Sequence, residues 1–386
     1  MLKRSDKGWR IRIMAAIAGL SLLAAPAAPV NAGPKSFAYL DDGRTYVPLR
    51  LLGEYAGASV SWHPEEQRVV LRKDGGEIVL HVGRTEAVVD GRAVPLDAPP
   101  FVRDGVTYVP LRFAGRALGL EIEWRQDAGA VRAVRGDGEM RLPAVPVGSI
   151  RKDAPPVVHE TREFQVDGRR VKAQMITISL MDPRVELDVV VAKDEVGRTE
   201  ELGAMAERHG AAVAINGAFF DAYTESDYKK PYGWLLNDGE VLSRGDTFRR
   251  ATFIYDRNHL AEIAEGLDMP DLIRAGGIDG AVQAGPRLVR NGRVDLDVEG
   301  EGFTDPKILS MSGARSALGI TRDHRLILVT VPAATIPELA EIMLQAGAWQ
   351  AMNLDGGASS GLYYNGRYLT KPGRLLSNAL IVKLEP

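Results

Sequence analysis

The sequence predicts two domains of different fold class. We expect a small α+β domain made of two repeats over residues 34–136, and a larger α/β domain over residues 161–386, with a mixed sheet flanked by helices. Three observations lead to this prediction. A segment of the first third of the chain recurs 62 residues later, residues 137–160 are rich in proline and predict a linker, and strand and helix patterns alternate in the remainder.

The repeat relates residues 43–53 to residues 105–115, and both copies contain the run Tyr-Val-Pro-Leu-Arg. Each copy is typical of a turn, a short strand, a helix that begins at Pro-Leu-Arg, and further strands. Asp90 and Gly91 predict a hairpin turn between the copies. The repeated aromatics favour core positions, with sugar stacking as the alternative; they are Tyr46, Tyr108, Trp62 and Trp124.

The first 32 residues are predicted to be a secretory signal peptide. A basic segment precedes the apolar run of residues 13–25, and residues 30–32 form an A-x-A-like cleavage site. The apolar run is shorter than the roughly 20 residues that span a bilayer. Removal of residues 1–32 takes away five basic and one acidic side chain, so the net charge changes from −3 to −7. That charge argues against nucleic acid and anionic membranes as partners, and the absence of cysteine excludes disulfides and thiolate chemistry.

Two strand–helix–strand patterns in the larger domain each end on an asparagine. The strand of residues 211–215 ends at Asn216, and the strand of residues 348–352 ends at Asn353. Ligands of open α/β sheets bind beyond the carboxyl ends of the strands, so two neighbouring strands would direct both amides into one crevice. The alternative is that each asparagine only stabilises a turn.

The loop after Asn353 carries an unusual concentration of small and polar residues. Its sequence is Leu-Asp-Gly-Gly-Ala-Ser-Ser, in which Asp355 is the only charge. Gly356 and Gly357 allow close approach of a ligand to the backbone, and Ser359 and Ser360 add hydroxyl groups. This loop is the best candidate for the floor of an active site.

Four motifs, in this order, resemble the phosphodiester glycosidase family over residues 161–386. They are Asn216-Gly-Ala-Phe-Phe220, Ala284-Gly-Pro-Arg-Leu288, Gly313-Ala-Arg-Ser-Ala-Leu-Gly319 and Asn353-Leu-Asp-Gly-Gly-Ala-Ser-Ser360. Residues 34–136 resemble the copper amine oxidase N-terminal-like domain, a stalk module of exported bacterial proteins. The first resemblance implies cleavage of a sugar, such as N-acetylglucosamine, from a phosphodiester at the anomeric carbon. Ala218 and Ala358 depart from it, because glycine is frequent at both positions.

The resemblance implies a catalytic set of Asp355, Arg315 and Asn353. Phosphate is a good leaving group, so one carboxylate acting as nucleophile or base can suffice, and Asp355 is our candidate. Its alternative role is to cap the turn through its own backbone. Arg315 matches the family arginine and would hold the phosphate, since its planar guanidinium binds phosphate oxygens in pairs. The alternative is a surface arginine in an ion pair.

Ten further residues are predicted to bind substrate. Asp221 opens a polar loop that would form a lid or supply a second carboxylate, and Gly285-Pro286 would present backbone to the sugar or only form a structural hairpin. The full set comprises Asn216, Gly217, Asp221, Gly285, Pro286, Gly356, Gly357, Ser359, Ser360 and Asn378.

No cofactor is expected, although scattered aspartates leave calcium or magnesium open. The function predicted from these residues is an exported hydrolase, secreted or wall-associated, that acts on phosphate-linked envelope glycans such as teichoic-acid-like polymers or exopolysaccharide. The alternative is a non-catalytic or structural envelope protein that binds a glycan in the same crevice. No membrane span is expected after signal removal.

Overall fold

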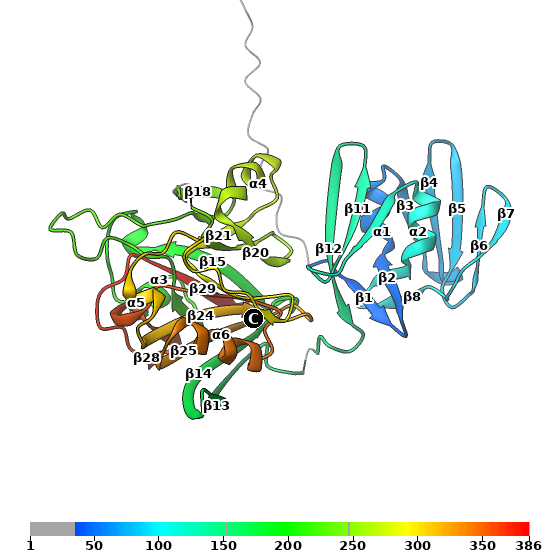
Figure 1. Cartoon of the computed structure of the whole chain (residues 1–386). Coiled ribbons are helices and arrows are strands. Elements are labelled where there is room, and N and C mark those ends of the chain that lie inside the picture. Colours follow the sequence, from blue (N-terminus) through cyan, green and yellow to red (C-terminus); the bar gives the residue numbers. More distant parts are fainter. Residues whose placement is uncertain (1–34, 152, 246–247, 386) are drawn as a thin grey trace, which may run out of the picture. The chain divides into compact units, whose positions relative to one another are not determined.

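The computed structural model describes residues 35–151, 153–245 and 248–385. The predicted signal peptide lies outside these residues. The described chain consists mainly of strands arranged in five sheets, with short helices between them (Figure 1).

The N-terminal region, residues 35–146, contains two sheets and two helices. One sheet has the order β10-β11-β12-β1-β2-β9-β8 and the other the order β3-β4-β5-β6-β7. The elements are β1 (Ala38–Asp41), β2 (Arg44–Pro48), α1 (Leu49–Tyr55), β3 (Ser59–His63), β4 (Arg68–Lys73), β5 (Gly76–His81), β6 (Glu86–Val89), β7 (Arg92–Pro95), β8 (Phe101–Arg103), β9 (Val106–Pro110), α2 (Leu111–Leu118), β10 (Glu121–Arg125), β11 (Ala130–Arg135) and β12 (Gly138–Pro146).

The two sequence repeats fold into equivalent units. β2, α1 and β3 form one unit, and β9, α2 and β10 form the other. β2 and β9 pair antiparallel about Val47 and Val109, so the copies meet through the same strand. Tyr46 and Tyr108 are buried, as the core interpretation requires, and Trp62 is half-buried. Trp124 is 43% exposed, so the core interpretation is wrong for this residue. The hairpin turn predicted at Asp90-Gly91 connects β6 to β7, and both residues have positive φ angles, as such a two-residue turn needs.

The C-terminal region, residues 157–385, contains three sheets. Their orders are β13-β14-β25-β24-β26-β22-β23, β15-β29-β16-β27-β28 and β18-β17-β21-β19-β20. The strands are β13 (Val157–Val166), β14 (Arg169–Ser179), β15 (Val185–Val191), β16 (Val213–Asn216), β17 (Leu235–Asn237), β18 (Glu240–Ser243), β19 (Ala251–Tyr255), β20 (Ala261–Glu265), β21 (Gly280–Gln283), β22 (Arg287–Arg290), β23 (Arg293–Val294), β24 (Gly313–Ile320), β25 (Arg325–Ala334), β26 (Gln350–Asn353), β27 (Leu362–Tyr364), β28 (Arg367–Thr370) and β29 (Asn378–Leu384).

Four short α-helices and four 3-10 turns complete the described elements. The helices are α3 (Leu202–Arg208), α4 (Met269–Ala275), α5 (Pro306–Leu309) and α6 (Ile336–Gln345), and the 3-10 turns are η1 (Pro64–Glu66), η2 (Ala192–Asp194), η3 (Gly266–Asp268) and η4 (Gly357–Ser359). A capping box opens α6: the Glu338 backbone N–H donates to Thr335 Oγ1 at 3.3 Å, and the Thr335 N–H donates to Glu338 Oε2 at 2.7 Å. Leu339 and Ile342 of this helix are fully buried.

The prediction of an α/β fold for the C-terminal region is wrong. Both strand–helix–strand units exist, but an antiparallel strand lies between the two parallel strands of each unit. β29 separates β15 from β16, and β24 separates β25 from β26. Local periodicity could not reveal this, because β29 comes from the end of the chain. The described fold is therefore mainly β, with antiparallel sheets in place of a mixed sheet flanked by helices.

The asparagine-bearing strands also do not pair side by side. β16 belongs to a five-stranded sheet and β26 to a seven-stranded sheet. The proline-rich residues 137–160, expected to be a linker, contain β12 and the first residues of β13. β12 pairs antiparallel with β11 and parallel with β1, so it completes the first sheet.

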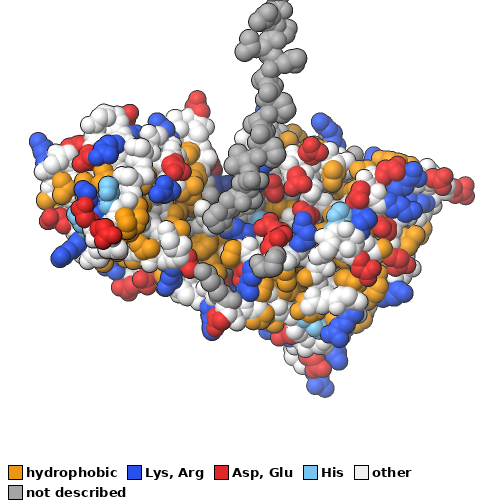
Figure 2. Space-filling view, turned by 180° about the vertical axis from the view of Figure 1, so that it is seen from behind, with side chains coloured by type: hydrophobic (Ala, Val, Ile, Leu, Met, Phe, Trp, Pro, Cys, Tyr) orange, Lys and Arg blue, Asp and Glu red, His pale blue; other side chains and the backbone are white. Residues whose placement is uncertain are grey.

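The surface of the described residues carries charges of both signs. On the face drawn in Figure 2, basic and acidic side chains are interspersed rather than separated into large fields. Among the described helices, none has the length and hydrophobicity that a bilayer crossing would require.

Candidate active site

The carboxyl ends of β16 and β26 meet although they lie in different sheets. The Asp355 backbone N–H donates to the carbonyl oxygen of Gly217 at 3.1 Å. In the opposite direction, Asn216 Nδ2 donates to the carbonyl oxygen of Asp355 at 2.6 Å. These two bonds fix the glycine-rich loop after β26 against the end of β16.

Asn216 and Asn353 are interior residues. Asn216 is 1% exposed, and its Oδ1 accepts hydrogen bonds from Ser316 Oγ at 2.7 Å and from the Gly361 N–H at 3.0 Å. Asn353 is completely buried, and its Nδ2 donates to the carbonyl oxygens of Gly285 and Leu354. Both amides therefore hold neighbouring loops in place.

Asn378 has a similar role. Its Oδ1 accepts from the Ala218 N–H at 2.7 Å, and its Nδ2 donates to Ser377 Oγ at 2.7 Å. A Cβ atom at Gly217 would lie 2.3 Å from Asn378 Oδ1, so this position needs glycine to bring the two segments together.

A cavity of about 560 Å³ opens above the loop that follows Asn353. Such a volume is typical of small-ligand sites. Among the residues predicted from the sequence, six line this cavity: Asp221, Arg315, Asp355, Gly356, Gly357 and Ser359. The other predicted residues do not belong to its lining: Asn216, Gly217, Gly285, Pro286, Asn353, Ser360 and Asn378.

The surroundings of Asp355 shift its pKa. Burial raises its pKa to about 6, and this effect exceeds the opposing stabilisation of the charge by the Ser359 hydroxyl, the Gly356 N–H and the Arg374 guanidinium. The other two carboxylates of the cavity lining bind backbone. Asp221 Oδ1 accepts from the Thr224 N–H at 3.1 Å, and Asp305 Oδ1 accepts from the Lys307 N–H at 2.9 Å.

Arg315 is buried, and most of its donors bind backbone carbonyl oxygens. Nε donates to Ala334 at 3.0 Å, and Nη2 donates to Lys307 and Met311, each at 2.7 Å. Burial lowers the pKa of Arg315, and no interaction with a described carboxylate counteracts this effect. Nη1 lies near Gly356: a Cβ atom added to this glycine would be 3.6 Å from Arg315 Nη1. The guanidinium thus fixes the segment that carries Lys307, and Gly356, beside its Nη1, is another residue of the cavity lining.

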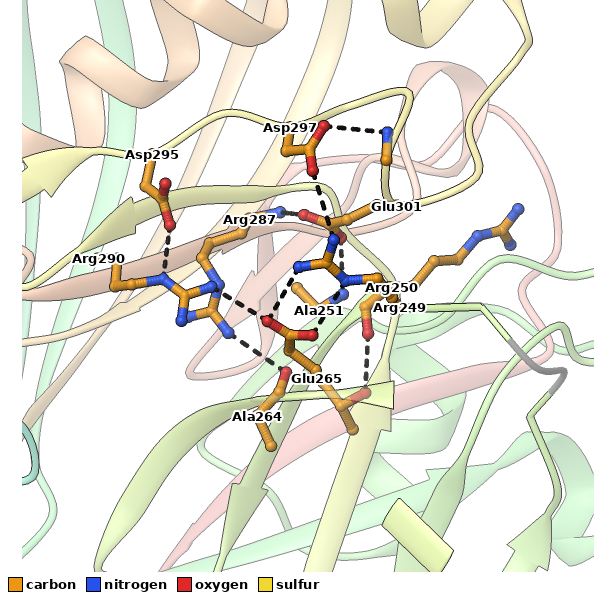
Figure 3. Close-up of polar contacts among 12 residues, drawn as sticks. Arg249, Arg250, Ala251, Ala264, Glu265, Arg287, Arg290, Asp295, Asp297 and Glu301 are labelled. Carbon is orange, nitrogen blue, oxygen red and sulfur yellow. Dashed lines mark hydrogen bonds and ion pairs between the residues drawn. The ribbon is translucent and has the colours of Figure 1, made fainter. Parts of the chain in front are cut away.

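A polar network around Glu301 adjoins the Gly285-Pro286 turn. The buried carboxylate of Glu301 accepts from the backbone N–H groups of Ala251 and Arg287, each at 2.7 Å (Figure 3). Burial raises the pKa of Glu301, and the two N–H donors counteract that effect. Gly285 has φ of 96°, and a Cβ atom there would lie 2.7 Å from Glu301 Oε2.

Gly285→Ala is expected to lower the free energy of unfolding by about 2–4 kcal/mol, because alanine is strained at this φ and its Cβ would contact Glu301 Oε2. Urea denaturation followed by fluorescence measures the change. Gly313→Ala is the matched control, since no atom lies within 4 Å of a Cβ at that position. Equal stability of the two variants would contradict a structural role for Gly285.

Two family models match the chain. A family model for phosphodiester glycosidase matches residues 209–383. The C-terminal region carries a phosphodiester glycosidase domain. A second model, for the copper amine oxidase N-terminal domain, matches residues 30–133. Both resemblances inferred from the sequence are confirmed.

Solved structures share the fold at low sequence identity. A hypothetical protein from Synechocystis covers 91% of this chain and 99% of its own, with a TM-score of 0.51 and 16% identity. The catalytic domain of zebrafish N-acetylglucosamine-1-phosphodiester alpha-N-acetylglucosaminidase, auto-inhibited by its pro-peptide, covers 61% of this chain and 86% of that chain, with a TM-score of 0.52 and 18% identity. No curated protein matches the chain.

Several residues in the cavity of the phosphodiester glycosidase domain had no signal in the sequence. Arg250 lies with its Cζ 4.5 Å from the ring centroid of Phe303, and both residues line the cavity. Lys307, Arg374 and Tyr223 line it as well. They come from separate segments of the chain and belong to no recognisable spacing, so only the fold brings them together. Among the described residues, no group of three or more His, Asp or Glu side chains is placed to hold a metal ion.

Proposed function

We propose that the phosphodiester glycosidase domain hydrolyses glycosyl phosphodiesters, with Asp355 as the nucleophile or the base that activates water. The observation that carries the proposal is the position of Asp355 in a cavity that also contains Arg250, Lys307, Arg315 and Arg374. Guanidinium and ammonium groups bind phosphate, and a carboxylate with a raised pKa is suited to proton transfer near neutral pH.

The chemistry needs few groups because phosphate is a good leaving group. Cleavage of the bond between the anomeric carbon and its oxygen leaves that oxygen on phosphorus, so no protonated alcohol has to depart. One carboxylate and a set of cations would then be sufficient. The sequence resemblance and the name of the zebrafish structural relative favour an N-acetylglucosamine-like sugar. The predicted signal peptide favours an exported enzyme that acts on phosphate-linked envelope glycans.

Release of sugar from a panel of sugar-1-phosphodiesters tests this function. We expect turnover of at least one phosphodiester by the full chain, with each assay repeated in the presence of a chelator to test for a divalent cation. Chromogenic glycosides without phosphate provide the control. If they are cleaved as efficiently as the phosphodiesters, phosphate has no role in recognition and the proposal fails.

The pH dependence of the reaction should report the Asp355 carboxylate. A nucleophile or base must be ionised, so kcat/KM is expected to fall about tenfold per pH unit below a midpoint near pH 6. Arg374→Gln should move this midpoint upward, because the guanidinium favours the ionised form. A profile that is flat from pH 4.5 to 8 would exclude Asp355 as the titrating group.

A further inference from the structure

Two cations flank one exposed tyrosine at the cavity. Arg374, from the loop between β28 and β29, donates from Nη2 to Tyr223 Oη at 2.8 Å, and its Cζ lies 4.8 Å from the ring centroid. Lys307 of α5 has its Nζ 5.7 Å from the same centroid. Tyr223 is 77% exposed, and all three residues line the cavity that contains Asp355. Three segments far apart in the sequence therefore place two positive charges around one ring.

Among the described residues, no ion pair holds either of these two cations. Within the described residues, neither Lys307 nor Arg374 has a carboxylate oxygen within 4.0 Å, whereas many arginines elsewhere form ion pairs, as Arg208 does with Glu200 at 2.6 Å. The field of Arg374 nevertheless reaches the Asp355 carboxyl and favours its ionised form. The charges are thus available to an anion in the cavity and lie near the candidate reacting group.

The backbone of Lys307 is held by two other residues of the cavity. Arg315 Nη2 donates to the Lys307 carbonyl oxygen, and Asp305 Oδ1 accepts from the Lys307 N–H. The side chain of Lys307 remains exposed. Arg315 therefore supports the segment from which Lys307 extends, a role that differs from the direct phosphate contact expected from the sequence.

We propose that Lys307 and Arg374 form a phosphate clasp that binds the leaving phosphate of the substrate, and that Arg315 is a positioning residue for this clasp. The inference rests on the proposed function and deepens it. Tyr223 separates the two cations and accepts a hydrogen bond from one of them, so both charges can face a single phosphate from two sides.

The reaction gives this clasp a greater effect on the transition state than on the substrate. The bond from the anomeric carbon to oxygen breaks, and the electron pair stays on the phosphate oxygen. Water supplies the new hydroxyl at the anomeric carbon and loses one proton, which Asp355 can accept and release to solvent. A phosphodiester with one negative charge thereby becomes a phosphomonoester with a charge between about −1.5 and −2 at pH 7. Because negative charge grows along this path, the two cations should raise kcat.

The same charge difference makes product inhibition a consequence of the clasp. A phosphomonoester, or inorganic phosphate, carries more charge than the substrate diester and should compete for Lys307 and Arg374. The class of compound that inhibits this enzyme is therefore a terminal phosphate, including the phosphate end left on a polymer after the sugar is removed.

Lys307→Gln and Arg374→Gln in the full chain test the clasp, with Lys371→Gln as the matched control. Lys371 is exposed, lies three positions before Arg374 and is not part of the cavity lining. We expect each clasp variant to lower kcat by about 10- to 100-fold and to weaken inhibition by inorganic phosphate about tenfold. Lys371→Gln should stay within about twofold of wild type in both measurements.

A direct measurement of inorganic phosphate binding tests the clasp independently of the proposed function. Calorimetry on wild type, Lys307→Gln and Arg374→Gln needs no turnover, and loss of binding in both variants supports the clasp even if no glycosyl phosphodiester is cleaved. Unchanged phosphate binding and unchanged phosphate inhibition in both variants would overturn it, including when wild type is an active hydrolase.

Discussion

Asp355→Asn is expected to lower kcat for a glycosyl phosphodiester by about a thousandfold, because the amide can neither attack the anomeric carbon nor accept a proton from water. The substitution keeps the size of the side chain and leaves the cations of the cavity in place. Binding of inorganic phosphate should therefore be retained. The measurement is sugar release under saturating substrate, beside calorimetric phosphate binding. Loss of phosphate binding together with activity would point to a collapsed loop and contradict the catalytic role.

The same variant should be more stable than wild type at neutral pH. The folded-state pKa of Asp355, about 6, lies above its ordinary value of 3.8, so the stability that this group contributes is complete below pH 3.8 and is lost as the pH rises through 6. An uncharged Asn avoids that loss. We expect a gain in the free energy of unfolding of up to about 3 kcal/mol at pH 8, which disappears near pH 4. A variant that is less stable at every pH would support the turn-capping role instead.

Much of this site could be predicted from the order of four short motifs. The loop of residues 353–360 was recognised because an isolated carboxylate among glycines and serines after a buried strand is unusual. The structure places Asp355, Gly356, Gly357 and Ser359 on one cavity. Whether these residues act on substrate stays a prediction, although their shared location is the condition on which that prediction depends.

The fold class was mispredicted for a physical reason. Strand and helix periodicities are local, whereas the pairing partner of a strand is set by burial across the whole domain. β29 begins 193 positions after the start of β15 (378 − 185), yet it lies between β15 and β16 and converts a parallel arrangement into an antiparallel one. The amides were misplaced for a related reason. An asparagine at a strand end has the same sequence pattern whether it faces a ligand or joins two sheets.

Lys307 and Arg374 could not be found from the sequence at all. Charged residues in loops are common, and most are solvated or form weak ion pairs, so neither residue stands out among the 48 basic residues of the chain. Their significance comes from a shared tyrosine and from the cavity they line, and both are properties of the tertiary structure.

Asn216→Leu is expected to lower the free energy of unfolding by about 3–5 kcal/mol. The substitution removes three hydrogen bonds, to the Asp355 carbonyl oxygen, Ser316 Oγ and the Gly361 N–H, and leaves these groups without that partner inside the protein. Leucine has a similar size, so loss of packing contributes little. Urea denaturation measures the change. Because the hydrogen bond to Asp355 also fixes the candidate catalytic loop, kcat should fall even at urea concentrations at which the variant is still folded.

Ser316→Ala provides the graded comparison for this network. It removes one of the three hydrogen bonds and leaves Asn216 bound to Asp355 and Gly361, so the expected loss is about 1 kcal/mol with activity nearly unchanged. If Asn216→Leu proved as stable as Ser316→Ala and only the KM for the sugar increased, the amide would contact substrate, as its position at a strand end suggested. A large loss of stability would instead establish that Asn216 joins the two sheets on which the cavity is built.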